Sequence, residues 1–356
     1  MYPWLEEPLA QFASAFRRGR LPGSVIIAGN SGFGTMDLAL ECAKLYLCHE
    51  SGVRACGACR SCAVFEAAAH PDFTIAVSST AEECNDEEDL TRDPGFLALI
   101  DSASASRRAV RVDTIRRLNH WLYESPALGH GKAAIIHDAH TMGESAANAA
   151  LKTFEEPPPH TLIIMVVDSL EEMLPTILSR ALKLQLKTLD RSVALNWLTE
   201  NTGLELSRCA VALDLCHDAP LSAAALLQEN LDLAALDVVR RLIAVLNGTG
   251  SSQAVTAALK PLSPAFHGTF WSVLALQILK FKAGYPLERL SLIHVEGAQA
   301  LLRMPGDTLF ELPAELPFIT AHQPLIPSRA PEALSTALVE RLTGSAGLTL
   351  HRGGAR

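Results

Sequence analysis

The sequence predicts a mixed α/β first half followed by an all-helical second half. Short apolar runs alternate with helix-length segments up to about residue 167, and a glycine-rich turn follows the first run. Beyond that point the pattern changes to helical periodicities broken by Gly and Pro. With 356 residues, the chain is long enough for two or three domains of roughly 150 residues each.

Four apolar runs are predicted to form the strands of a mostly parallel sheet. They are SVIIA (24–28), DFTIAV (72–77), KAAIIH (132–137) and TLIIMVV (161–167). The segments between them predict a helix from about Met36 to Leu47, a helix with Val112, Ile115, Leu118 and Leu122 on one face, and a helix stopped by Pro157 to Pro159.

After about Asp168 the strand signals end, and RSVALNWLTENTG and LDVVRRLIAVLNG are typical of helices. We therefore expect an α/β domain at 1–167, a small all-α domain at 168–207, an all-α C-terminal domain at 208–343 and a flexible tail at 344–356. The acidic stretch 80–94 lacks apolar periodicity and is interpreted as a solvated loop insertion.

Composition favours globular domains and sets limits on partners. Hydrophobic residues make up 49% of the chain and charged residues 19%, which argues against global disorder. The net charge of -9 repels nucleic acid, so any DNA contact requires a local basic patch or partner subunits. No run of about 18 apolar residues and no signal-like N-terminus is present, so we expect a cytoplasmic protein without membrane contact.

Four of the 8 cysteines lie close together in the sequence. Cys48 is followed after seven residues by Cys56, then after two by Cys59 and after two more by Cys62. Two successive C-x-x-C steps bring thiolates onto a tetrahedral Zn²⁺, and an all-sulfur site leaves no open position for water. We expect a structural zinc site; free thiols, disulfides and an iron-sulfur cluster are the alternatives. Four other cysteines are scattered and interpreted as ordinary thiols: Cys42, Cys84, Cys209 and Cys216.

The loop after the first predicted strand has the glycine frame of a phosphate loop and lacks its chemistry. GNSGFGTM places Gly29 and Gly34 in the pattern G-x-x-x-x-G-K-S/T. Thr35 stands at the lysine position and Met36 at the Ser/Thr position, so the phosphate-binding ammonium and the Mg²⁺-binding hydroxyl are both missing. An ordinary strand-to-helix turn is the alternative.

The third predicted strand ends at a second degenerate position. ATPases need an aspartate for the metal and a glutamate to activate water there, whereas this sequence has His137 and Asp138. We interpret both as strand-end residues without a catalytic role.

Over about residues 2–228, the sequence contains YPWLEEPLAQF, the degenerate loop, the cysteine cluster, VDTIRRL, KTFEEPP and TILSRA. In the content and order of these motifs, the sequence resembles the bacterial clamp-loader family. The resemblance implies an AAA+ α/β domain with an inserted zinc module, a helical lid and a helical collar, the collar resting on fold analogy beyond CHDAPLSAAALLQ. Zinc cysteines with a degenerate loop resemble the delta-prime type, and zinc cysteines with an intact loop the gamma/tau type.

The resemblance also implies roles for particular residues. Arg180 in TILSRA takes the place of an arginine that acts in trans on ATP bound by a neighbouring gamma/tau subunit, although Ala181 departs from the usual Ser-Arg-Cys. Leu221 replaces a lid arginine of active relatives. The charged helix end at Lys152, Glu155 and Glu156 is interpreted as a solvated face without a role.

The resemblance therefore implies a non-hydrolysing clamp-loader subunit of the replicative polymerase, with gamma/tau and delta subunits, primed DNA and, indirectly, the sliding clamp as partners. An active gamma/tau-like ATPase with an unusual loop is the alternative. A zinc-stabilised DNA-binding protein acting alone is disfavoured by the acidic balance and by the absence of a basic, aromatic-interleaved stretch.

Overall fold

The computed structural model describes residues 1–50, 52–78, 90–93, 109–187, 189–260, 262–306, 309 and 339. The contact pattern divides the chain into two units, Met1–Leu189 and Asp190–Arg356. The predicted division at 168 and 208 stays a prediction. Most of the acidic stretch 80–94, Cys84 and the tail 344–356 lie outside the described residues.

The first unit is built around a mixed sheet of six strands in the order β3-β2-β4-β5-β1-β6. All neighbouring pairs are parallel except β2 with β3. The strands are β1 (Ser24–Ala28), β2 (Phe73–Ala76), β3 (Leu90–Thr91), β4 (Lys132–Ile136), β5 (Thr161–Val167) and β6 (Leu182–Gln185). The four predicted strands are thus confirmed as β1, β2, β4 and β5.

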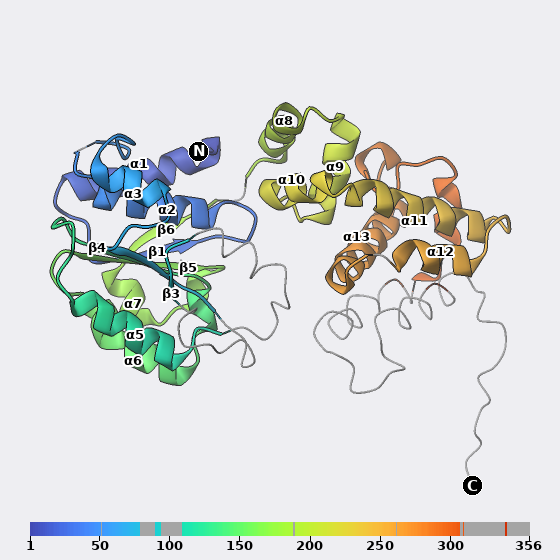
Figure 1. Ribbon diagram of the computed structural model, residues 1–356. Helices are drawn as coiled ribbons and strands as arrows, with labels where there is room; N and C mark the ends of the chain where they lie inside the picture. Colours follow the sequence, from blue (N-terminus) through green and yellow to red (C-terminus); the bar gives the residue numbers. More distant parts are fainter. Residues whose placement is uncertain are drawn as a thin grey trace, which may run out of the picture. The chain divides into compact units, whose positions relative to one another are not determined.

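Helices cover both faces of this sheet (Figure 1). One face carries η1 (Pro3–Leu5), α1 (Glu6–Arg17), α2 (Thr35–Leu47) and α3 (Arg60–Glu66); the other carries α5 (Val112–Tyr123), η3 (Ala139–Thr141), α6 (Glu144–Glu155), η4 (Leu170–Glu172) and α7 (Pro175–Arg180). Successive residues of a strand alternate between two cores because side chains alternate across a sheet. In β1, Val25 and Ile27 join the first core, and Ile26 and Ala28 join the second.

Two expectations for this unit were wrong. Strands do not end at Val167, because β6 pairs in parallel with β1. Of its residues, Leu184 alone is fully buried, which is the half-buried pattern of an edge strand rather than the apolar run of a central one. The acidic stretch is not all loop either, because Leu90 and Thr91 form the short strand β3.

The second unit is helical in the part that the structure describes, as predicted. Its elements are α8 (Arg191–Thr202), α9 (Leu206–Leu215), α10 (Pro220–Gln228), α11 (Leu231–Leu246), α12 (Ser252–Leu259), α13 (Pro264–Lys282), η5 (Leu287–Arg289) and η6 (Ala298–Arg303). Across the ranges given above, no single helix has both the length and the hydropathy needed to cross a membrane. Helices α9 and α10 together have the length and composition of a membrane span, but the chain bends by 115° between them.

Polar side chains join the helices of this unit. The Asp214 carboxylate accepts from the Arg191 guanidinium at 2.7 Å and from the Gln277 amide at 2.8 Å, linking α9 to α8 and α13. The fully buried Asp232 of α11 accepts two hydrogen bonds from Arg208 of α9. Because buried charges are costly unless paired, these contacts favour one packing of the helices.

Candidate functional site

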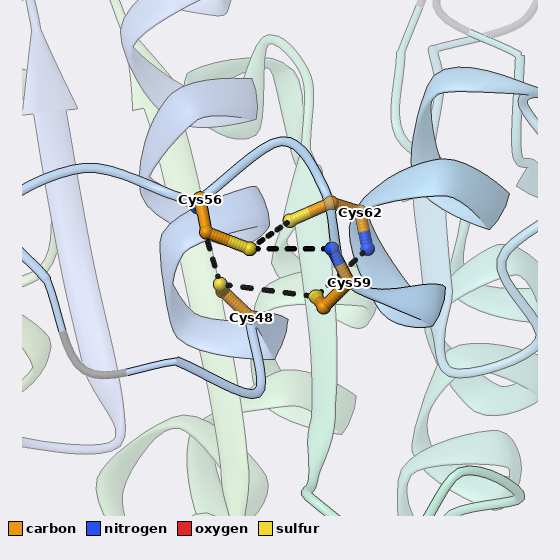
Figure 2. A group of neighbouring side chains, drawn as sticks. All are labelled: Cys48, Cys56, Cys59 and Cys62. Carbon is orange, nitrogen blue, oxygen red and sulfur yellow. Dashed lines mark hydrogen bonds between the residues drawn. The ribbon is translucent and has the colours of Figure 1, made fainter.

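The four clustered cysteines come together at the end of α2 and the start of α3 (Figure 2). Cys48 directly follows α2 as its C-cap and has an extended backbone, and Cys59 caps the N-terminus of α3. Their four sulfur atoms lie within 4.8 Å of one another, with Cys48–Cys59 and Cys56–Cys62 separations of 4.0 Å. Four thiolates on a tetrahedral Zn²⁺ at about 2.3 Å stand roughly 3.8 Å apart, so the arrangement fits this ion.

Backbone amides point at three of these sulfurs. The donor-to-sulfur distances are 3.3–3.4 Å. The amides of Glu50 and Cys56 donate to Cys48 Sγ, those of Ala58 and Cys59 donate to Cys56 Sγ, and that of Cys62 donates to Cys59 Sγ. Amide donors stabilise a negatively charged sulfur. The loop therefore prepares thiolates, the form in which cysteine binds a metal.

The thiols do not ionise independently. Burial disfavours the Cys59 thiolate, but amides of Cys62 and His49 and the neighbouring thiols lower the pKa of Cys59 to about 6. Burial and the neighbouring sulfurs raise the pKa of Cys62 to about 12. Cys59 therefore ionises more readily than an ordinary thiol, whereas Cys62 resists ionisation. A divalent cation removes this resistance, because its charge offsets the repulsion between thiolates.

Side chains around the cluster fix the cysteine loop to its surroundings. Ser61 Oγ donates to the carbonyl of Leu47 at 2.7 Å and contacts His70 Nε2 at 3.0 Å. Arg54 forms an ion pair with Glu6 of α1 at 3.0 Å. The scattered cysteines of the described residues are free, and burial raises the pKa of Cys216 to about 12, as expected for an inert thiol.

The glycine loop lies at the other end of α2. Gly34 caps this helix in the left-handed conformation with φ of 87°. Thr35 is buried, and its Cγ2 lies 3.1 Å from where a Cβ on Gly29 would be. Met36 packs against the apolar core on this face of the sheet. Thr35 therefore has no ammonium at the lysine position of the phosphate-loop pattern, and Met36 has no hydroxyl at the Ser/Thr position.

N-terminal residues and an acidic side chain surround Gly34. A Cβ on Gly34 would meet Tyr2 and Leu5 at 3.2 Å and the Asp37 carboxylate at 3.5 Å. The Trp4 indole donates to the carbonyl of Phe33 at 2.8 Å. Burial is the main cause that raises the pKa of Asp37. This carboxylate lies in the first turn of α2, where an anion such as phosphate would otherwise bind.

His137 and Asp138 follow β4 at the carboxyl edge of the sheet, the same edge at which the glycine loop follows β1. His137 Nδ1 lies 3.1 Å from Asp138 Oδ2. Asp138 has a positive φ of 51°. Burial disfavours its charged form, but the His137 hydrogen bond, His140 and Ser78 outweigh burial and lower the pKa of Asp138. These side chains contact one another at the carboxyl end of β4.

Arg180 lies at the opposite edge of the sheet. It is the last residue of α7, and β6 begins two residues later in parallel with β1. Arg180 is therefore close to the amino edge, and the five residues of β1, about 16 Å at 3.3 Å per residue, separate this edge from the glycine loop. Its side chain is 52% exposed and has an ion pair with Glu155 at 3.3 Å.

Three features were missed from the sequence. Glu155 was interpreted as a solvated residue, yet it contacts Arg180. The packing of Tyr2 and Asp37 around Gly34 depends on tertiary contacts that no local motif carries. Strand β6 had a signal, because Leu182, Leu184 and Leu186 alternate with polar residues as an edge strand requires.

Comparison with known proteins identifies the family. The family model described as DNA polymerase III, delta subunit, matches residues 4–190, which is more than half of the chain. The chain belongs to the DNA polymerase III delta-subunit family. The family match spans nearly all of the first unit and ends where the helical second unit begins.

Curated relatives in this family are delta' subunits of DNA polymerase III. The Haemophilus influenzae protein is 28% identical over 229 residues, covering 64% of this chain and 62% of the relative. The Escherichia coli delta' subunit is 28% identical over 229 residues, covering 64% and 61%. The match therefore spans about three fifths of these relatives' length. Among solved structures, a gamma-subunit-related protein of Thermotoga maritima aligns over 94% of this chain and 99% of that one at 15% identity, with a TM-score of 0.44.

Proposed function

We propose that this protein is a non-hydrolysing, delta-prime-type subunit of a DNA polymerase III clamp loader, which supplies Arg180 to ATP bound by a neighbouring gamma/tau subunit. It helps the ATP-dependent loading of the sliding clamp on primed DNA. Family membership supports the clamp-loader assignment. The proposal includes a division into an AAA+ domain, a lid and a collar after residues 167 and 207. It also includes gamma/tau and delta subunits as partners, an indirect contact with the clamp, a contact with DNA within the complex, and a cytoplasmic location.

The position of Arg180 carries the proposal. Its half-exposed guanidinium lies at the amino edge of the sheet, whereas the glycine loop and His137 lie at the carboxyl edge. Arg180 is thus too far away to reach a phosphate at this chain's own loop, and its 52% exposed side chain supports a role toward a neighbouring subunit. Arginine presents a planar fork of N–H donors that matches phosphate and stabilises charge on a transferring phosphoryl group.

The degenerate carboxyl edge supports the absence of hydrolysis. Thr35 and Met36 take the places of the lysine and the hydroxyl, and the Asp37 carboxylate lies beside Gly34. His137 is a poor ligand for Mg²⁺, which prefers oxygen, and it already contacts Asp138. These features favour a silent site over the active gamma/tau-like ATPase.

The cysteine cluster completes the proposal with a structural Zn²⁺. Cys48, Cys56, Cys59 and Cys62 would hold the ion, and the all-sulfur set leaves no position for substrate or water. Because Cys48 follows α2 and Cys62 belongs to α3, the ion would cross-link these two helices.

ATP hydrolysis by the assembled complex tests this proposal. The purified chain is combined with gamma/tau and delta subunits, clamp and primed DNA, using wild type, Arg180→Ala or Arg180→Lys. We expect both variants to assemble and the turnover at the site that Arg180 completes to fall by about 10³-fold or more, because an arginine finger contributes that much. Lysine retains the charge and loses the planar fork.

Arg241→Ala is the matched control, because Arg241 is also half-exposed and paired with an acidic side chain, Asp237. It should leave hydrolysis unchanged. Wild-type hydrolysis with Arg180→Ala in an intact complex would contradict the trans-acting role.

A further inference from the structure

Glu155 is the acidic partner of Arg180, and the two residues come from different helices. Glu155 is the last residue of α6, and its Oε2 lies 3.3 Å from Arg180 Nη1 at the end of α7. The Glu155 side chain is 28% exposed and the Arg180 side chain 52%. The carboxylate is therefore the more enclosed member of the pair.

The end of α6 is firmly anchored. Phe154 is fully buried, and its carbonyl accepts a hydrogen bond from Ser24 Oγ at 2.7 Å, at the start of the buried strand β1. The amide of Glu156 continues the helical pattern by donating to Lys152 at 3.0 Å. Glu155 is thus held against the sheet by its own chain neighbours, which fixes its carboxylate beside Arg180.

Arg180 has less support of its own. Helix α7 has six residues, and among them Ile177 is buried. A long, half-exposed arginine side chain can adopt many rotamers, and this freedom is lost when the guanidinium binds a phosphate. A fixed carboxylate beside it reduces this freedom before the neighbour binds.

The contact leaves most of the guanidinium available. It joins Nη1 to one carboxylate oxygen, and the structure gives the Arg180 side chain no second ion pair among the described residues. A guanidinium has five N–H donors, so a contact through one nitrogen leaves donors for a phosphate. A bidentate pair would instead occupy the fork that phosphate requires.

We propose that Glu155 is a positioning residue that holds the Arg180 guanidinium in the orientation it needs to reach a phosphate of the neighbouring subunit. The inference rests on the proposed function of Arg180. Glu155 touches neither the nucleotide nor the reacting atoms and acts through Arg180. Its carboxylate is required, because a neutral amide cannot form the ion pair.

The test compares Glu155→Gln with Glu156→Gln in the assembled complex. Glu156 is the adjacent carboxylate on the same helix end, and among the described residues no ion pair joins it to Arg180. Glu155→Gln should lower kcat for ATP hydrolysis at the site that Arg180 completes by about 10-fold with little change in KM, since misplacing a catalytic group by about 1 Å can cost up to 10²-fold. Glu156→Gln should match wild type.

A double variant shows whether Glu155 acts through Arg180. Glu155→Gln should have no further effect on kcat in an Arg180→Ala background, whereas a structural role would lower it equally in both backgrounds. Thermal unfolding and assembly of Glu155→Gln are measured alongside and should equal those of wild type.

The outcomes separate this inference from the proposed function. If Arg180→Ala has no effect, the trans-acting arginine is wrong and the role of Glu155 falls with it. If Arg180→Ala lowers hydrolysis but Glu155→Gln equals or exceeds wild type, the positioning role alone is overturned.

Discussion

The two ends of helix α2 differ in what their side chains can bind. At the N-terminal end, the glycine loop is surrounded by Tyr2, Leu5 and the Asp37 carboxylate. At the C-terminal end, Cys48 joins three other thiols whose sulfurs lie within 4.8 Å of one another. One end keeps a backbone frame without the side chains for its ligand, whereas the other keeps a complete ligand set.

This difference shows that the backbone frame of a motif can be present without the side chains that the motif requires. Gly34 retains the left-handed conformation that begins α2, because the strand-to-helix turn requires it even without phosphate. The four cysteines have no comparable backbone requirement, and a short loop with little apolar content would gain order from a bound ion. The strand-to-helix turn therefore accounts for Gly34, whereas the proposed metal site accounts for the four cysteines.

Removing one metal ligand should have the largest effect on stability. Cys62→Ser replaces a buried thiol at the start of α3, so we expect loss of the zinc and destabilisation by about 4 kcal/mol or more. Zinc content by atomic spectroscopy and urea unfolding measure both. Cys216→Ser lies outside the cluster and should retain the metal. Equal zinc in Cys62→Ser and wild type would refute the four-cysteine site.

Adding a methyl group to the glycine loop or to the cysteine loop should lower stability by smaller and unequal amounts. In Gly29→Ala, the new Cβ would lie 2.9 Å from Leu186 Cβ, so overpacking should cost about 1–3 kcal/mol. In Gly57→Ala, nothing lies within 4 Å, and the positive φ of 70° should cost about 1 kcal/mol. Urea unfolding midpoints compare the two, and a larger loss for Gly57→Ala would contradict the packed glycine loop.

The contact between His137 and Asp138 at the end of β4 should have a small effect on stability, and only at acidic pH. His137 helps to lower the pKa of Asp138 below its ordinary value of 3.8. A depressed carboxyl pKa contributes stability above 3.8, and this contribution is lost as the pH falls through the lower folded value. His137→Asn should raise the pKa of Asp138 and weaken this pH dependence. An NMR titration of the Asp138 carboxyl measures the shift, and an unchanged pKa would show that His137 has no such role.

Local patterns predicted much of the fold and one of the sites. Strands β1, β2, β4 and β5 are continuous apolar runs because both faces of the sheet are covered, and such runs are visible without tertiary information. The cysteine spacing likewise predicted a cluster, since the ligands lie within one short segment.

Features formed between distant segments were not predictable in the same way. Edge strand β6 buries Leu184 alone, so its apolar signal is weak. The ion pair of Glu155 with Arg180 depends on how α6 and α7 pack on the sheet, and nothing local in KTFEEPP distinguishes a paired glutamate from a solvated one. The same holds for Tyr2, whose contact with Gly34 joins residues far apart in the chain.

Zinc content and ATP turnover of the isolated chain test the contrast between the two ends of α2 most directly. The measurement uses wild type and Thr35→Lys. This substitution supplies the lysine of the phosphate-loop pattern, but Met36 still lacks a metal-binding hydroxyl, and His137 and Asp138 still stand in place of the aspartate and glutamate of an ATPase. We predict one zinc ion per chain and no ATP turnover by either protein. Turnover by the wild-type chain that disappears when the glycine loop is mutated would contradict the account.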